Sequence, residues 1–122
     1  MLNFLLTAPA RNWIVAADMQ SFPLIYSGEK QILTFDMTKS LVAPNSLVTP
    51  AQPTITVTCV LGNDNDPQGI LNGGASVDST GLLIQVGVAP TIPGVQYLVK
   101  VNAASNNPLI APSLAAFLQV GV

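Results

Sequence analysis

The stretch Thr54-Ile55-Thr56-Val57-Thr58-Cys59-Val60-Leu61 decides the fold, because its residues alternate between two kinds of environment. Ile55, Val57, Cys59 and Leu61 share one face, while the other face carries Thr54, Thr56, Thr58 and Val60. A period of two is the pattern of a half-buried β-strand, and β-branched residues favour extended backbone. This stretch therefore predicts a strand with an apolar inner face.

The same alternation recurs along the chain, with turn residues between the runs. It predicts further strands over 31–37, 82–88, 95–103 and 114–120. Gly, Pro and Asn cluster between them, as in Asn72-Gly73-Gly74 and Ile92-Pro93-Gly94. Short strands at a spacing of about ten residues are typical of a β-sandwich. The expected core is Phe35, Ile55, Val57, Cys59, Ile84, Val86, Tyr97, Val99 and Leu118.

The composition argues against catalysis and against nucleic-acid binding. The 122 residues include no histidine and one cysteine, and only 8% are charged while 49% are hydrophobic. Histidine is the commonest group that titrates near neutral pH, and a hydroxyl nucleophile has none here to activate it. The four Lys and Arg residues are scattered singly, so no basic patch is available for phosphates. We expect a protein that is not an enzyme, uses no cofactor and binds neither nucleic acid nor a membrane.

The loop Gly62–Gly69 is the one cluster of candidate cation ligands. Asp64, Asp66, Gln68 and Gly69 resemble the start of a calcium-binding loop, in which alternate oxygens converge on one cation. The closing glutamate of that pattern is absent, since position 75 is Ala75. A polar turn between two strands explains the same residues, and we expect no metal site.

Two possible carboxylate pairs, Asp36 with Asp78 and Glu29 with Asp36, resemble the pairs of glycoside hydrolases. Nothing in the sequence brings either pair together, so we expect solvated or turn-capping roles.

The first 26 residues concentrate the aromatic side chains Phe4, Trp13, Phe22 and Tyr26. Large aromatics are typical anchors at protein interfaces, but they also complete a domain's own core. We expect residues 1–20 to form a docking arm on a β-sandwich of residues 21–122, and deletion of the arm to leave that sandwich folded. The partner-binding residues would be Phe4, Leu5, Leu6, Trp13, Ile14 and Val15.

Two segments resemble small immunoglobulin-like structural proteins of tailed phages and prophages. Residues 22–41 have an aromatic, a Gly-Glu turn and a strand that ends in Phe-Asp, and residues 93–105 are similar to that family's Gly-x-x-Tyr strand. In many immunoglobulin-like sandwiches this Tyr serves as a corner residue.

The resemblance implies an immunoglobulin-like antiparallel β-sandwich of about seven strands with an extended N-terminal arm. It further implies a virion protein that decorates the capsid, forms a head fibre or assists the neck or tail. Its partners would be the major capsid, portal, adaptor or tail proteins, and it would form a homo-oligomer within the assembly. The alternative is a β-sandwich module that binds carbohydrate or a cell surface through residues 63–66.

Overall fold

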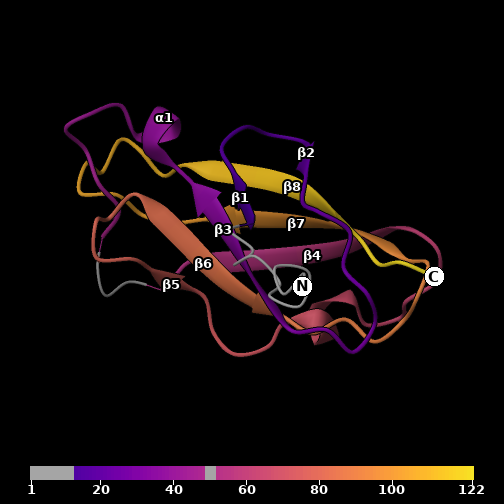
Figure 1. Ribbon diagram of the computed structural model, residues 1–122. Coiled ribbons are helices and arrows are strands. Elements are labelled where there is room, and N and C mark those ends of the chain that lie inside the picture. The colour runs from indigo at the N-terminus through magenta and orange to yellow at the C-terminus, as the bar shows by residue number, and fades with distance from the viewer. Residues whose placement is uncertain (1–12, 49–51) are drawn as a thin grey trace, which may run out of the picture.

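The chain folds into two four-stranded β-sheets that pack face to face (Figure 1). The computed structural model describes residues 13–48 and 52–122. The first sheet has the order β1 (Trp13–Val15), β3 (Gln31–Asp36), β6 (Leu83–Val88) and β5 (Ser76–Val77). The second has the order β2 (Gln20–Ser21), β8 (Ser113–Gln119), β7 (Gln96–Asn102) and β4 (Thr54–Leu61). The predicted β-sandwich is confirmed, and the described residues form eight strands where about seven were expected.

Helix is confined to two single turns in the described residues. They are α1 (Thr38–Leu41) and the 3₁₀ turn η2 (Pro67–Ile70). In residues 13–48 and 52–122, no helix is long and apolar enough to cross a lipid bilayer.

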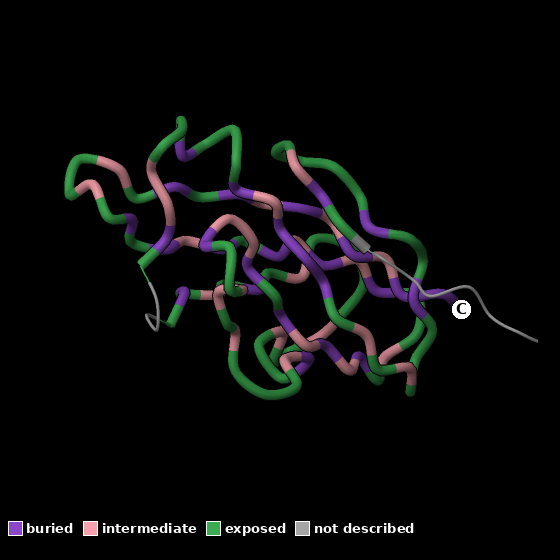
Figure 2. The backbone as a smooth tube through the Cα atoms, turned by 60° about the vertical axis from the view of Figure 1, so that its left-hand side comes forward, coloured by how far each residue is buried: buried purple, intermediate pink, exposed green. Residues whose placement is uncertain are grey.

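The predicted strands form where the alternation is strongest. Most side chains on the predicted inner face of each strand lie in the core, as expected. Figure 2 shows buried residues alternating with more exposed ones along the chain. Seven of the nine predicted core residues are buried, and Ile55 and Cys59 pack against the core while partly exposed. These two lie on β4, an outer strand of its sheet, which leaves one flank of each side chain uncovered.

Leu61 departs from the predicted pattern, since its side chain is 61% exposed. The β4–β7 register runs regularly from Thr54 to Cys59 and then shifts between Cys59 and Leu61, where the ladder has a β-bulge. A bulge inserts one extra residue and reverses the facing of the residues after it. The period of two therefore ends at Cys59.

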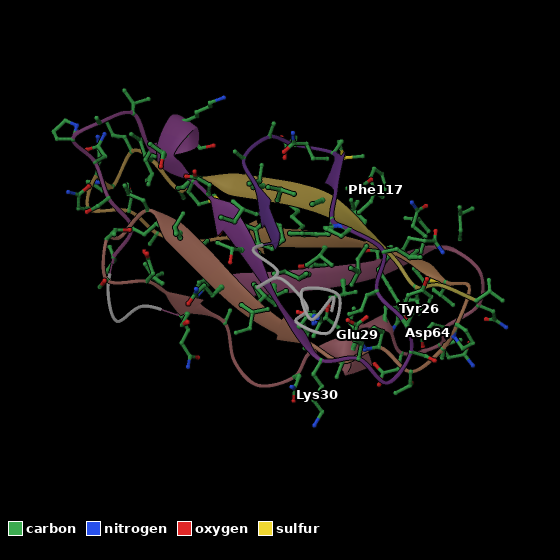
Figure 3. The ribbon with its side chains drawn as sticks, in the orientation of Figure 1. Tyr26, Glu29, Lys30, Asp64 and Phe117 are labelled. Carbon is green, nitrogen blue, oxygen red and sulfur yellow. The ribbon has the colours of Figure 1, made fainter. Side chains whose placement is uncertain are left out.

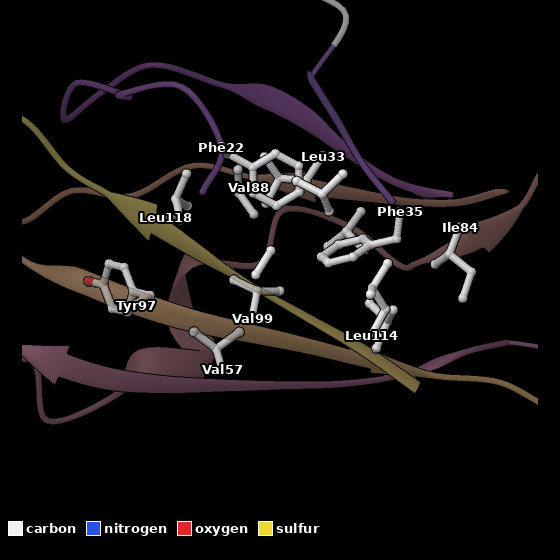
Figure 4. Close-up of a cluster of buried hydrophobic side chains, with 14 of the residues drawn as sticks. Phe22, Leu33, Phe35, Val57, Ile84, Val88, Tyr97, Val99, Leu114 and Leu118 are labelled. Carbon is white, nitrogen blue, oxygen red and sulfur yellow. The ribbon is translucent and has the colours of Figure 1, made fainter. Parts of the chain in front are cut away.

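The core lies between the inner faces of the two sheets (Figure 4). Phe35 from β3 and Phe22 from the segment after β2 meet edge to face, with ring centroids 5.3 Å apart and planes at 82°. Aromatic pairs prefer this geometry because the positive edge of one ring faces the negative face of the other. The contact joins the segment after β2 to β3 within the core of the sandwich.

Residues 13–21 contribute one short strand to each sheet. β1 pairs in parallel with β3, and β2 pairs in parallel with β8. Between them the side-chain carbonyl of Gln20 accepts hydrogen bonds from the amides of Ala16 and Ala17, at 3.1 and 3.2 Å. Met19 has a φ of 64°, the left-handed backbone that a tight crossing from one sheet to the other requires. Residues 13–21 therefore form part of both sheets.

We predict that Phe35→Ala lowers the free energy of unfolding by about 3–5 kcal/mol, because the truncation leaves a cavity between the sheets. Ile32→Ala, on the outer face of the same strand, should change it by less than about 0.5 kcal/mol. Chemical denaturation of both variants tests this. Equal losses would show that the outer face of β3 is packed as tightly as the inner one.

Candidate functional site

The residues predicted to bind a partner divide between the core and the surface. Val15 is only 3% exposed and packs in the domain's own core, whereas Ile14, its neighbour on β1, is 44% exposed. Trp13 begins β1, and its side chain lies outside the described part of the chain. Phe4, Leu5 and Leu6 lie outside the described residues. Of the six, Ile14 is the one whose side chain is placed on the surface.

Residues 18–20, predicted as the end of the arm, are attached to the sandwich. The Met19 amide donates to the Ala115 carbonyl at 2.7 Å, and the Ala115 amide donates to Asp18 Oδ1 at 2.9 Å. The expected boundary after residue 20 falls inside β2. The part of the predicted arm that comes after residue 12 therefore belongs to the folded domain.

The two described aromatics of the N-terminal region have different environments. Phe22 is buried, whereas the Tyr26 side chain is 54% exposed at the C-terminal end of the sandwich (Figure 3). A Cβ built on Gly121 would lie 2.6 Å from Tyr26 Cε1 and 3.3 Å from Leu24 Cδ2. Only glycine at position 121 lets both side chains lie this close to the backbone. Leu24 is also exposed, and with Tyr26 it forms an apolar surface beside Gly121 that we call the Tyr26 patch.

The Asn-Asp loop is organised by hydrogen bonds within the protein. The Tyr97 hydroxyl donates to Asp64 Oδ2 at 2.6 Å, and the Asp66 amide donates to Asp64 Oδ1 at 2.8 Å. Tyr97 is fully buried on β7, so this bond attaches the loop to the core. Burial, and then the hydrogen bond to Asp64, raise the pKa of Tyr97 well above its usual value. The hydroxyl thus binds a side chain 33 residues upstream, not the nearby backbone that a corner tyrosine uses.

Gln68, a candidate calcium ligand, is instead bonded to β4. Its Nε2 donates to the Ile55 carbonyl at 3.2 Å, and its Oε1 accepts from the Val57 amide. Among the described residues no three His, Cys, Asp or Glu side chains are grouped as a metal site would need.

Each carboxylate of the two proposed pairs serves its own turn. Asp36 Oδ1 accepts from the backbone and hydroxyl of Thr38, and Glu29 accepts from the Tyr26 amide and from Gln31 Nε2. Asp78 Oδ1 accepts from the Thr80 hydroxyl at 2.7 Å. Burial acts to raise the pKa of Asp78, but hydrogen bonds from Thr80 and backbone amides outweigh it and hold that pKa below its usual value. The predicted turn-capping role fits these contacts.

A groove that the sequence did not reveal lies on the outer face of the first sheet. Its volume is about 530 Å³, and its lining combines polar side chains with Ile32 and two glycines. The lining residues are Lys30, Gln31, Ile32, Asn72, Gly74, Ser76, Gln85 and Gly87. The Asn72 carbonyl lies directly over Gly87, where a Cβ would approach it to 2.4 Å. The groove brings together strands from three parts of the chain, and no local motif marks it.

Neither a protein-family model nor a curated protein matches this chain. Among solved structures, the chain is similar to one titled as the solution structure of amebosin, at 15% sequence identity. The similarity covers 88% of this chain and 95% of that one, with a TM-score of 0.37. At that TM-score it supports no argument about function.

We predict that Tyr97→Phe lowers stability at pH 7 by about 1–2 kcal/mol, because Asp64 loses a charge-assisted hydrogen bond. An unfolded tyrosine titrates near pH 10, and the folded pKa is higher. The contribution of Tyr97 is therefore complete below about pH 10 and declines as the pH rises above it. The free energy of unfolding, measured from pH 8 to 11, should fall more steeply with pH for the natural chain than for Tyr97→Phe. Parallel curves would contradict the buried hydrogen bond.

We also predict that the two N-terminal deletions differ. Removal of residues 1–12 should leave a folded sandwich, since it spares β1, β2 and Val15. Removal of residues 1–20 deletes the β1 ladder and a core side chain, and should lower the thermal midpoint by several degrees or abolish cooperative unfolding. Circular dichroism melts of both proteins give the answer. Equal melting of the two would show that β1 adds nothing to stability.

Proposed function

We propose that this protein is a non-enzymatic structural component of a tailed-phage virion, which docks on the capsid or on the neck or tail through protein–protein contacts. The segments 22–41 and 93–105 support this through their resemblance to immunoglobulin-like phage proteins. The strand orders β3–β6–β5 and β4–β7–β8 support the immunoglobulin-like part, because they correspond to B–E–D and C–F–G of that sandwich.

The main support from the structure is the Tyr26 patch. Leu24 and Tyr26 expose apolar surface together at one end of the sandwich, beside backbone that has no side chain at Gly121. The chain has only four Lys or Arg and six Asp or Glu residues, so few charges are present to keep a chain with such an apolar surface soluble. Exposed apolar surface of this kind, with tyrosine in it, is typical of protein-binding sites.

The polar side chains support a structural role as well. Asp36, Asp64 and Asp78 each accept hydrogen bonds that define a turn or hold a loop. Gln68 and Gln20 satisfy backbone groups of nearby strands and turns. These contacts use polar groups to shape the domain, which fits a protein that acts by presenting a surface.

The experiment is to track the chain in phage particles purified on a density gradient from a host that expresses it. We expect it to band with the capsid protein at a fixed ratio. A chain that stays at the top of the gradient while capsid protein bands below would contradict the proposal.

Variants of the patch locate the contact. Tyr26→Ser should reduce the amount of chain on the particles at least tenfold. Leu109→Ser is the matched control, because Leu109 is 92% exposed and lies before β8, whereas the patch lies beyond its other end. It should bind as the natural chain does. Equal loss in both variants would show that the patch is not the docking surface.

The carbohydrate-binding alternative makes a different prediction. A glycan array should detect binding that is lost in Asp64→Ala and kept in Tyr97→Phe, since both variants release the loop but only one removes the carboxylate. Such a result, together with no particle binding, would favour the alternative.

A further inference from the structure

The four outer strands of the two sheets are very unequal in length. In the described part of the chain, β1, β2 and β5 have three, two and two residues, whereas β4 has eight. Outer strands present unpaired backbone groups, and proteins commonly keep them very short to prevent pairing with another chain. Three edges of this sandwich obey that rule, and β4 does not.

The β4 strand also lacks two of the usual protections of an outer strand, charged residues and proline. Residues 54–61 contain no charged residue and no proline. The side chains on its solvent face, Thr54, Thr56, Thr58 and Val60, are mostly exposed and all β-branched. An uncharged outer strand of this length is favourable for the addition of another strand.

The η2 turn and its Gln68 side chain cover part of the open side of β4. The Gln68 amide donates to the Ile55 carbonyl and accepts from the Val57 amide, which are the two bonds that a facing strand would make at that position. By the two-residue period, the Cys59 amide points to the same open side. Gln68 lies within η2, so a single short turn holds this amide against the strand.

We propose that β4 is a self-association edge, which pairs in antiparallel fashion with β4 of a second copy, and that Gln68 closes this edge in the single chain. A two-fold pair joins the two four-stranded sheets into one continuous sheet and uses the same surface on both copies.

The charges around β4 favour a second copy as the partner. A strand without charges meets no like charge when it faces itself. The lysine on the adjacent strand, Lys100, pairs with Thr56. In a two-fold pair the two copies of Lys100 would be about three strand spacings, or roughly 14 Å, apart, which exceeds the screening length in physiological salt.

This inference rests on the proposed function, a virion protein for which the resemblance implies a homo-oligomer, and it supplies a surface for that contact. It is tested on the purified chain in solution, so failure to self-associate and failure to dock on particles are separate results.

The test compares the natural chain with Gln68→Ala by light scattering across a concentration series. Loss of the Gln68 amide should tighten dimerisation at least tenfold. Gln85→Ala is the matched control, because Gln85 is an exposed glutamine on the other sheet and should leave association unchanged. The double variant Gln68→Ala with Thr58→Lys should return the chain to a monomer, because a lysine on an outer strand disfavours pairing with another strand.

Hydrogen exchange assigns the association to β4. In the Gln68→Ala dimer, the amides of Val57 and Cys59 should both exchange slowly, whereas in the natural monomer only the Val57 amide is covered. A Gln68→Ala chain that remains a monomer, or a dimer that Thr58→Lys does not dissociate, would overturn the proposal.

If Gln68→Ala fails to fold, the natural chain and Thr58→Lys decide the question at high concentration. The natural chain should associate weakly and Thr58→Lys should not. Equal behaviour of these two proteins would reject β4 as the contact. Binding of β4 to a segment of a different protein, without self-association, would reject the second copy as the partner.

Discussion

The burial of alternate side chains between two sheets is the constraint on which the rest of this structure depends. Phe35, Tyr97 and Leu118 are fully buried and come from three strands in two layers. Each Å² of apolar surface removed from water contributes about 25 cal/mol, and such burial offsets the entropy of ordering the chain. A chain with 8% charged residues has few other sources of stability. The turns and loops must therefore keep every strand in the register that maintains this burial.

Polar residues meet that requirement locally. Asp78 and Thr80 shape the turn before β6, and Gln20 closes the crossing between the first two strands. The hydrogen bond from the Tyr97 hydroxyl to Asp64 attaches the loop after β4 to the core. Since these groups already have partners, a substitution that removes one leaves the other unsatisfied, which is costly where water is excluded.

The surface that results is unusual in two respects, and both favour contacts with other proteins. Apolar side chains gather in the Tyr26 patch, and a long uncharged strand lies at the edge of the second sheet. The two features lie on different parts of the sandwich, so one copy can use both at once. The virion protein that we propose needs contacts of two kinds, to the particle and to its own neighbours, and we propose one of these surfaces for each.

The sequence by itself determined the five longer strands and the facing of most of their side chains, because both depend on a local period of two. Phe35, Ile84, Val99 and Leu118 were all expected inside, and all are buried. The pattern was not enough at Leu61, where a bulge set by pairing with β7 ends the period. The predicted boundary after residue 20 shows the same limit, since the parallel pairing of β1 and β2 depends on strands far along the chain.

Only the tertiary structure decided what the polar residues do. Asp64 and Gln68 belong to one loop and resemble ligands of one cation, yet one bonds to Tyr97 and the other to the edge of β4. Those partners are 33 and 13 residues away, and no local pattern encodes such distances. Hydrophobic periodicity is a local property of adjacent residues. The partner of a polar side chain depends instead on which strands the fold brings beside it.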